Sequence, residues 1–173
     1  MPMARRRKLL VGLVSIVVLL VAASVMLGAA FDGYRIPTES MAPTFQPGDR
    51  VLARGIAGAA ASPGDVVIFE MPTPDRLFEV ERISQVVAVE GDRVTTEDGR
   101  LVVNGKQVVE GYLPEGTRTE NLEAITVPDG HVYVLSDNRG NSQDSRLLGP
   151  IPHGNIYARV SIKWWPLAEF GGI

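Results

Sequence analysis

The sequence predicts a mainly β domain at residues 32–173 behind one N-terminal transmembrane helix. Residues 9–31 carry no charged side chain. As a helix this run is long enough to cross the roughly 30 Å hydrocarbon core of a bilayer. The rest of the chain alternates short β-prone runs with Gly, Pro and Asp turn signals, a pattern typical of an all-β or mostly β domain.

The N-terminus predicts the orientation of that helix. A basic cluster occupies residues 5–8, directly before the apolar run. By the positive-inside rule, residues 1–8 form a cytoplasmic tail and residues 32–173 lie outside the cytoplasm. Small residues at 28–30 would suit cleavage of a signal peptide, but the apolar run exceeds the roughly 7–15 residues of such a core. An uncleaved, single-pass signal-anchor in the cell membrane is therefore favoured.

Composition excludes several classes of site. The chain has no cysteine and only two histidines. Disulfides, thiolate zinc sites and a cysteine nucleophile are thereby excluded, and we expect neither a metal nor a cofactor. The net charge is −3, and no basic patch interleaved with aromatic residues predicts a nucleic-acid partner.

The β-prone runs follow one another closely after the anchor. The longest run covers residues 77–89, where alternation would place Val80, Arg82, Ser84, Val86 and Ala88 on one face. An Asp-Gly dipeptide between residues 94–96 and 101–103 predicts a hairpin. The other predicted strands are residues 50–53, 66–69, 107–109, 125–127, 131–135 and 156–163.

Two polar stretches interrupt the strands. Residues 36–49 read IPTESMAPTFQPGD, with Ser40 among three prolines that stiffen the backbone. A stiff, exposed hydroxyl suits a nucleophile, although a proline-rich surface turn has the same composition. Residues 136–146 read SDNRGNSQDSR and predict an irregular polar loop.

These two stretches and residues 62–72, SPGDVVIFEMP, resemble type I signal peptidases, in this order and behind one anchor. The resemblance covers nearly all of residues 32–173. It implies a membrane-anchored serine endopeptidase that removes signal peptides from exported preproteins. It also implies a signal-peptidase-like β domain with an SH3-like barrel core, resting partly on the lipid bilayer.

The resemblance assigns a role to individual residues. Ser40 matches the nucleophile, Thr38 the hydroxyl that helps stabilise the oxyanion, and Ser142 the serine that orients the general base. Residues that match the bracing of the site are Asp137, Arg139, Asp144 and Arg146. Candidates for the shallow apolar walls that select small substrate side chains are Ile36, Met41, Val86 and Ala88.

The chain departs from the family at the general base, which is a lysine in type I signal peptidases. Read without a gap, Ser84 occupies that position, and a serine cannot act as this base. An alternative register with Glu81 in place of the lysine needs an insertion before Gly91. Lys163 lies beside two tryptophans, where we expect a side chain that snorkels at the membrane surface.

Two interpretations follow from this departure. In the first, the chain is a working peptidase whose base is a water, a rearranged side chain or a residue of a partner protein. In the second, it is a weak or inactive signal-peptidase-like protein that binds peptides as an assembly factor or chaperone. A self-cleaving regulator and a plain structural domain fit the anchor and the polar motifs less well.

Overall fold

A computed structural model describes residues 12–22, 28, 31–72 and 79–172, and the chain divides into two units, Met1–Asp32 and Gly33–Ile173. In the first unit, residues 12–22 are helical and exposed. Within the described ranges, no helix is both long and apolar enough to span a membrane. The predicted tail and parts of the predicted anchor, residues 1–11, 23–27 and 29–30, lie outside the described residues.

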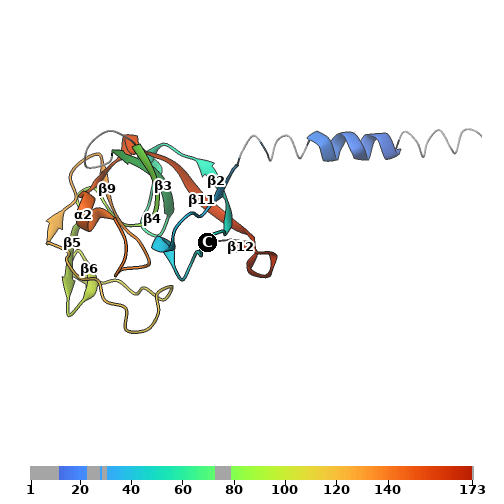
Figure 1. The fold of residues 1–173 in the computed structure, drawn as a ribbon. Helices are drawn as coiled ribbons and strands as arrows, with labels where there is room; N and C mark the ends of the chain where they lie inside the picture. The colour runs from blue at the N-terminus through green and yellow to red at the C-terminus, as the bar shows by residue number, and fades with distance from the viewer. Residues whose placement is uncertain (1–11, 23–27, 29–30, 73–78, 173) are drawn as a thin grey trace, which may run out of the picture. The chain divides into compact units, whose positions relative to one another are not determined.

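The second unit is mainly β, as the sequence predicts (Figure 1). A short helix, α2 (Ser145–Leu148), and four single turns, η1 (Glu39–Met41), η2 (Gly58–Ala60), η3 (His153–Asn155) and η4 (Leu167–Glu169), join the strands. The strands are β1 (Asp32–Arg35), β2 (Arg50–Gly55), β3 (Val66–Pro72), β4 (Glu79–Val89), β5 (Arg93–Glu97), β6 (Arg100–Val103), β7 (Lys106–Gln107), β8 (Ile125–Thr126), β9 (His131–Leu135), β10 (Ile151–Pro152), β11 (Ile156–Trp165) and β12 (Gly171–Gly172).

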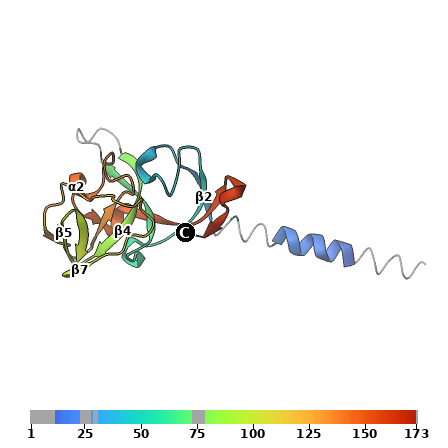
Figure 2. The ribbon, with the colours of Figure 1, turned by 90° about the horizontal axis from the view of Figure 1, so that it is seen from below.

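The strands form two sheets. The larger has the order β1-β2-β11-β3-β4-β9-β10, with β12 beside β11, and the smaller has the order β7-β6-β5-β8. Figures 1 and 2 both place the β5–β6 hairpin at the end of the second unit opposite β2. Asp98 and Gly99 turn this hairpin with φ values of 51° and 76°, which fits the predicted Asp-Gly turn.

Strand β4 positions the site because its two edges are paired over different lengths. On one edge, β3 pairs with β4 from Gln85 to Glu79. On the other edge, β9 pairs only with the part of β4 from Gln85 onward. Among the strands that the structure describes, none pairs with residues 79–84 on that second edge.

A bulge divides β4 near its end. The register against β9 shifts between Val86 and Ala88. Val86 packs in a core with Phe69, whereas Ala88 packs in another core with Leu101. The expectation that one alternating face runs along the whole of residues 77–89 is therefore wrong after Val86, because a bulge inserts an extra residue into the strand.

Candidate active site

The loop that carries Ser40 is fixed to the core by its own buried apolar side chains. Met41 and Phe45 are fully buried and pack with Ile36 in one apolar cluster. The N–H of Ile36 donates to the carbonyl of Asp49 at 2.9 Å, and the N–H of Gly48 donates to the carbonyl of Ile36 at 2.9 Å. Burying each of the two large side chains contributes about 1.5–3 kcal/mol. The loop therefore holds its shape independently of any substrate.

Lys163 binds Asp49 at the C-terminal end of the same loop. Its ammonium lies 2.6 Å from the carboxylate of Asp49 and 2.5 Å from that of Glu169, and it donates to the carbonyl of Thr44 at 3.2 Å. Burial alone would lower the pKa of Lys163, but the two carboxylates raise it above its ordinary value. The expectation that Lys163 snorkels at a membrane surface is wrong, because the side chain is buried and paired.

Ser40 lies in η1, and Thr38 caps this turn. The Thr38 hydroxyl donates to Oγ of Ser40 at 3.1 Å and accepts a long hydrogen bond of 3.5 Å from the N–H of Ser40. In the part of the chain that the structure describes, this is the one hydrogen bond to Oγ of Ser40. A hydroxyl and an N–H thus lie side by side where the oxygen of an attacked carbonyl would gain charge.

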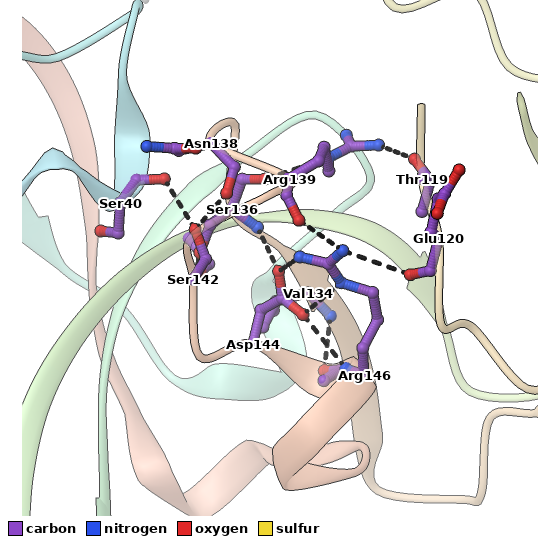
Figure 3. Close-up of polar contacts among 12 residues, drawn as sticks. Ser40, Thr119, Glu120, Val134, Ser136, Asn138, Arg139, Ser142, Asp144 and Arg146 are labelled. Atoms are coloured by element: carbon purple, nitrogen blue, oxygen red, sulfur yellow. Dashed lines mark hydrogen bonds and ion pairs between the residues drawn. The ribbon is translucent and has the colours of Figure 1, made fainter. Parts of the chain in front are cut away.

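The loop of residues 136–146 clamps the main chain around Ser40 (Figure 3). The N–H of Asn138 donates to the carbonyl of Ser40 at 2.9 Å, and its side-chain amide donates to the carbonyl of Glu39 at 3.2 Å. The Ser142 hydroxyl donates to the carbonyls of Ser40 at 3.3 Å and Asn138 at 2.5 Å. Asn138 was missed from the sequence, although it stands between two predicted bracing residues.

Asp144 and Arg146 hold the clamping loop from inside (Figure 3). The carboxylate of Asp144 is fully buried and accepts hydrogen bonds from the N–H of Ser136 at 3.0 Å and the N–H of Arg146 at 3.1 Å. It also accepts from Nε and Nη2 of Arg146 at 2.9 Å and 2.8 Å. Arg146 in turn donates to the carbonyl of Arg139 at 2.7 Å. This pair therefore fixes a loop that has little regular structure.

Arg139 ties the same loop to the segment of residues 110–120. Its guanidinium donates to the carbonyl of Ser136 at 3.0 Å, to the carboxylate of Glu110 at 2.6 Å and to the hydroxyl of Thr119. Nothing in the sequence pointed to Glu110 or Thr119, which lie in a polar, irregular stretch. The Arg139 side chain is almost completely buried, so this ion pair is shielded from solvent.

Asp137 belongs to the clamping loop, and its carboxyl group is buried. Oδ1 of Asp137 is buried and has no hydrogen-bond partner among the described residues. Burial raises the pKa of Asp137 to about 6, although Thr44 and Arg139 lower it in part. The carboxyl group therefore titrates near neutral pH.

Ser84 lies one residue away from the cavity that contains Ser40. Its hydroxyl is buried, donates to the carbonyl of Ile83 at 2.7 Å and lies 2.9 Å from the Ser136 hydroxyl. Because the single proton of Ser84 is used by Ile83, Ser136 is the donor between the two hydroxyls. Ser136 itself lines the cavity, so it stands between Ser84 and the open space.

The cavity has a volume of about 520 Å³ and lies between two extended segments. Residues 34–40 form one wall and residues 80–83 of β4 the other, with residues 136 and 140–143 closing the side. The structure brings Ser40, Thr38, Ser142 and Ile36 to this cavity. The other predicted wall residues, Met41, Val86 and Ala88, point into the core instead and do not line it.

Comparison with known proteins identifies the family. The family model described as "Signal peptidase, peptidase S26" matches residues 9–165. Signal peptidase IB of Staphylococcus aureus is 31% identical over 184 residues, which cover 95% of this chain and 94% of that protein. Thylakoidal processing peptidase 1 of Arabidopsis thaliana is 39% identical over 140 residues, which cover 76% of this chain.

The relatives differ in length. The matched region spans only 39% and 41% of two thylakoidal processing peptidases of Arabidopsis thaliana. Among solved structures, a signal peptidase I from Enterococcus faecalis is 25% identical with a TM-score of 0.44, covering 55% of this chain and 92% of that one. Because the family model matches most of its length, this chain belongs to the signal peptidase family, peptidase S26.

Proposed function

We propose that this chain is a serine endopeptidase that removes signal peptides from exported preproteins, with Ser40 as its nucleophile. One observation carries the proposal. The Ser40 hydroxyl lies at the cavity, 3.1 Å from the Thr38 hydroxyl, while the Ser40 carbonyl is held by Asn138 and Ser142. The family match supports the class of reaction.

The cavity suits a peptide in an extended conformation. Its two long walls are the segment of residues 34–40 and the edge of β4 that β9 leaves unpaired. A peptide that enters as an added strand gains main-chain hydrogen bonds from that edge. Ile36, Ile68 and Ile83 line the cavity with apolar surface, which favours substrates with small side chains beside the cleaved bond.

In the proposed reaction, Oγ of Ser40 attacks the peptide carbonyl. The N–H of Ser40 and the Thr38 hydroxyl, once turned away from Oγ, donate to the oxyanion and contribute roughly 3 kcal/mol each to stabilising the transition state. A water beside Ser136 and Ser142, which line the cavity, relays the proton of Ser40 to the nitrogen of the scissile bond. The C–N bond then breaks, the amine leaves and an acyl-enzyme ester forms on Ser40. A second water hydrolyses this ester and returns the proton to Oγ of Ser40. Asp137, Arg139, Asp144 and Arg146 keep the clamping loop in position, and Ser84 supports Ser136.

The proposal includes the membrane. Residues 9–31 act as a single-pass anchor with residues 1–8 in the cytoplasm, and residues 32–173, with an SH3-like barrel core, lie outside it. Apolar side chains of Trp165, Leu167 and Phe170 are exposed in residues 165–170, and tryptophan is enriched at the membrane–water interface. This arrangement would bring the cavity to preproteins that emerge from the bilayer.

Cleavage of a preprotein by the full chain in mild detergent tests the proposal. We expect the wild type to release the signal peptide and Ser40→Ala to release none. Ser62→Ala is the matched control, because Ser62 is exposed and outside the cavity. If the wild type cleaves at no pH but binds the peptide, the proposal is wrong and the chain is a peptide-binding assembly factor instead.

A further inference from the structure

Arg82 is a charged residue in the cavity that the proposed reaction does not use. It lies on β4, two residues before Ser84 and opposite Phe69 of β3, and it lines the same cavity as Ser40. Its Nε is buried and has no hydrogen-bond partner within the described ranges. A buried donor without a partner is destabilising and rare in folded proteins.

Among the described residues, Arg82 is not one of the arginines that form an ion pair. These arginines are Arg118, Arg139, Arg146 and Arg159. Glu39 and Glu81 line the same cavity, but neither is among the ion pairs of the described residues. The carboxylate of Glu81 instead accepts a hydrogen bond of 2.5 Å from the hydroxyl of Tyr157.

We propose that Arg82 determines specificity by binding a carboxylate side chain of the peptide substrate close to the cleaved bond. This inference rests on the proposed function of the cavity. A guanidinium presents Nε and one Nη side by side, which matches the two oxygens of a carboxylate. A peptide carbonyl would satisfy Nε but leave the positive charge unpaired, so a carboxylate is the better ligand.

The geometry of β4 also places this carboxylate along the peptide. Successive side chains of a strand point to opposite faces. Ile83 packs in the core cluster below Ser40, and Arg82 points to the other face, which it shares with Ser84. A peptide paired with this edge therefore presents its acidic side chain directly before or after the small residue that contacts Ile83.

Binding of labelled peptides to the full chain with Ser40→Ala tests the inference without requiring cleavage. Peptide pairs carry Glu or Gln at one position at a time on either side of the cleaved bond. We expect Glu to bind about tenfold more tightly than Gln at one position, which corresponds to about 1.4 kcal/mol, because hydrogen bonds between charged groups are stronger than those to a neutral amide.

Variants of Arg82 assign this preference to one side chain. In the same Ser40→Ala background, Arg82→Gln should abolish the preference for Glu, and Arg82→Glu should reverse it in favour of a Lys peptide. Arg100→Gln is the matched control. Arg100 is exposed on β6 and does not line the cavity, so this substitution removes the same charge away from the proposed site. The reversal distinguishes recognition from a structural role, because a merely destabilised variant would lose affinity for all peptides.

Four outcomes overturn the inference. Equal affinity for Glu and Gln peptides at every position does so, as does a preference that survives in Arg82→Gln. If the wild type cleaves Glu and Gln peptides with equal kcat/KM, the inference falls and the proposed function stands. If the wild type cleaves no peptide and Ser40→Ala binds none, both fall together.

Discussion

Replacing Asp144 with Ala tests whether the clamping loop depends on its buried ion pair. Asp144 is fully buried and accepts four hydrogen bonds, three of them from Arg146. Removing one partner of a buried pair costs about 3–5 kcal/mol, and losing the cap of α2 costs about 1 kcal/mol more. We therefore expect the free energy of unfolding to fall by about 4–6 kcal/mol, a large share of the 5–15 kcal/mol typical of a domain.

Urea denaturation of the full chain, followed by tryptophan fluorescence, measures this loss. The double variant Asp144→Ala/Arg146→Met leaves no buried charge at the pair and should lose less than the sum of the two single variants. Asp144→Asn keeps a capping oxygen and should fall between the wild type and Asp144→Ala. A loss below about 1 kcal/mol for Asp144→Ala, or strict additivity in the double variant, would refute the reasoning.

Three further predictions concern the surroundings of Ser40. Ser84→Lys should be combined with Ser136→Ala, which removes the hydroxyl beside residue 84. We expect this double variant to cleave the preprotein roughly 10²–10⁴-fold faster than the wild type, with a pH dependence set by the new amine. No gain in rate in a folded variant would contradict the gapless alignment that places Ser84 at the lysine position. Burial raises the pKa of Asp137 from its ordinary value of 3.8 to about 6, so the fold favours its protonated form. Its stabilising contribution is present below pH 3.8 and is lost as pH rises through 6. Asp137→Asn should remove this decrease in the free energy of unfolding with pH, measured by urea denaturation between pH 3.5 and 7. An unchanged pH dependence in the variant would contradict the prediction. Lys163→Met should cost about 3 kcal/mol, because it leaves the buried Asp49 carboxylate unpaired, and adding Asp49→Asn should recover part of that loss in the same assay.

Local sequence signals were sufficient for most strands. Runs of β-branched residues mark β3, β4, β9 and β11, and the Asp98-Gly99 turn marks the β5–β6 hairpin. Strand β1 was missed because it follows the apolar run directly and is defined by its pairing with β2. The bulge at Val86 and Ala88 was also missed, because it arises where β4 meets β9 and alternation within one strand does not reveal it.

The site was predictable in its residues but not in its connections. The proline-rich loop and the polar loop each stand out in the sequence, and the resemblance to signal peptidases joins them. The contact between them is made by the carbonyls of Glu39 and Ser40, which accept from the side-chain amide and the N–H of Asn138, about a hundred positions away. Helix α2 was not predicted for a related reason. Its capping residue, Asp144, is held in place by hydrogen bonds with Ser136 and Arg146 that the sequence alone does not reveal.

The unpaired edge of β4 also bears on the solubility of the protein. A strand edge that is open to a peptide is equally open to the edge of another copy, and such edges start aggregation. Here the open stretch of residues 79–84 carries three charged residues, Glu79, Glu81 and Arg82. Charged side chains at an open edge oppose pairing with another copy, because such pairing would remove them from water. The same stretch can thus admit a complementary peptide while discouraging self-association.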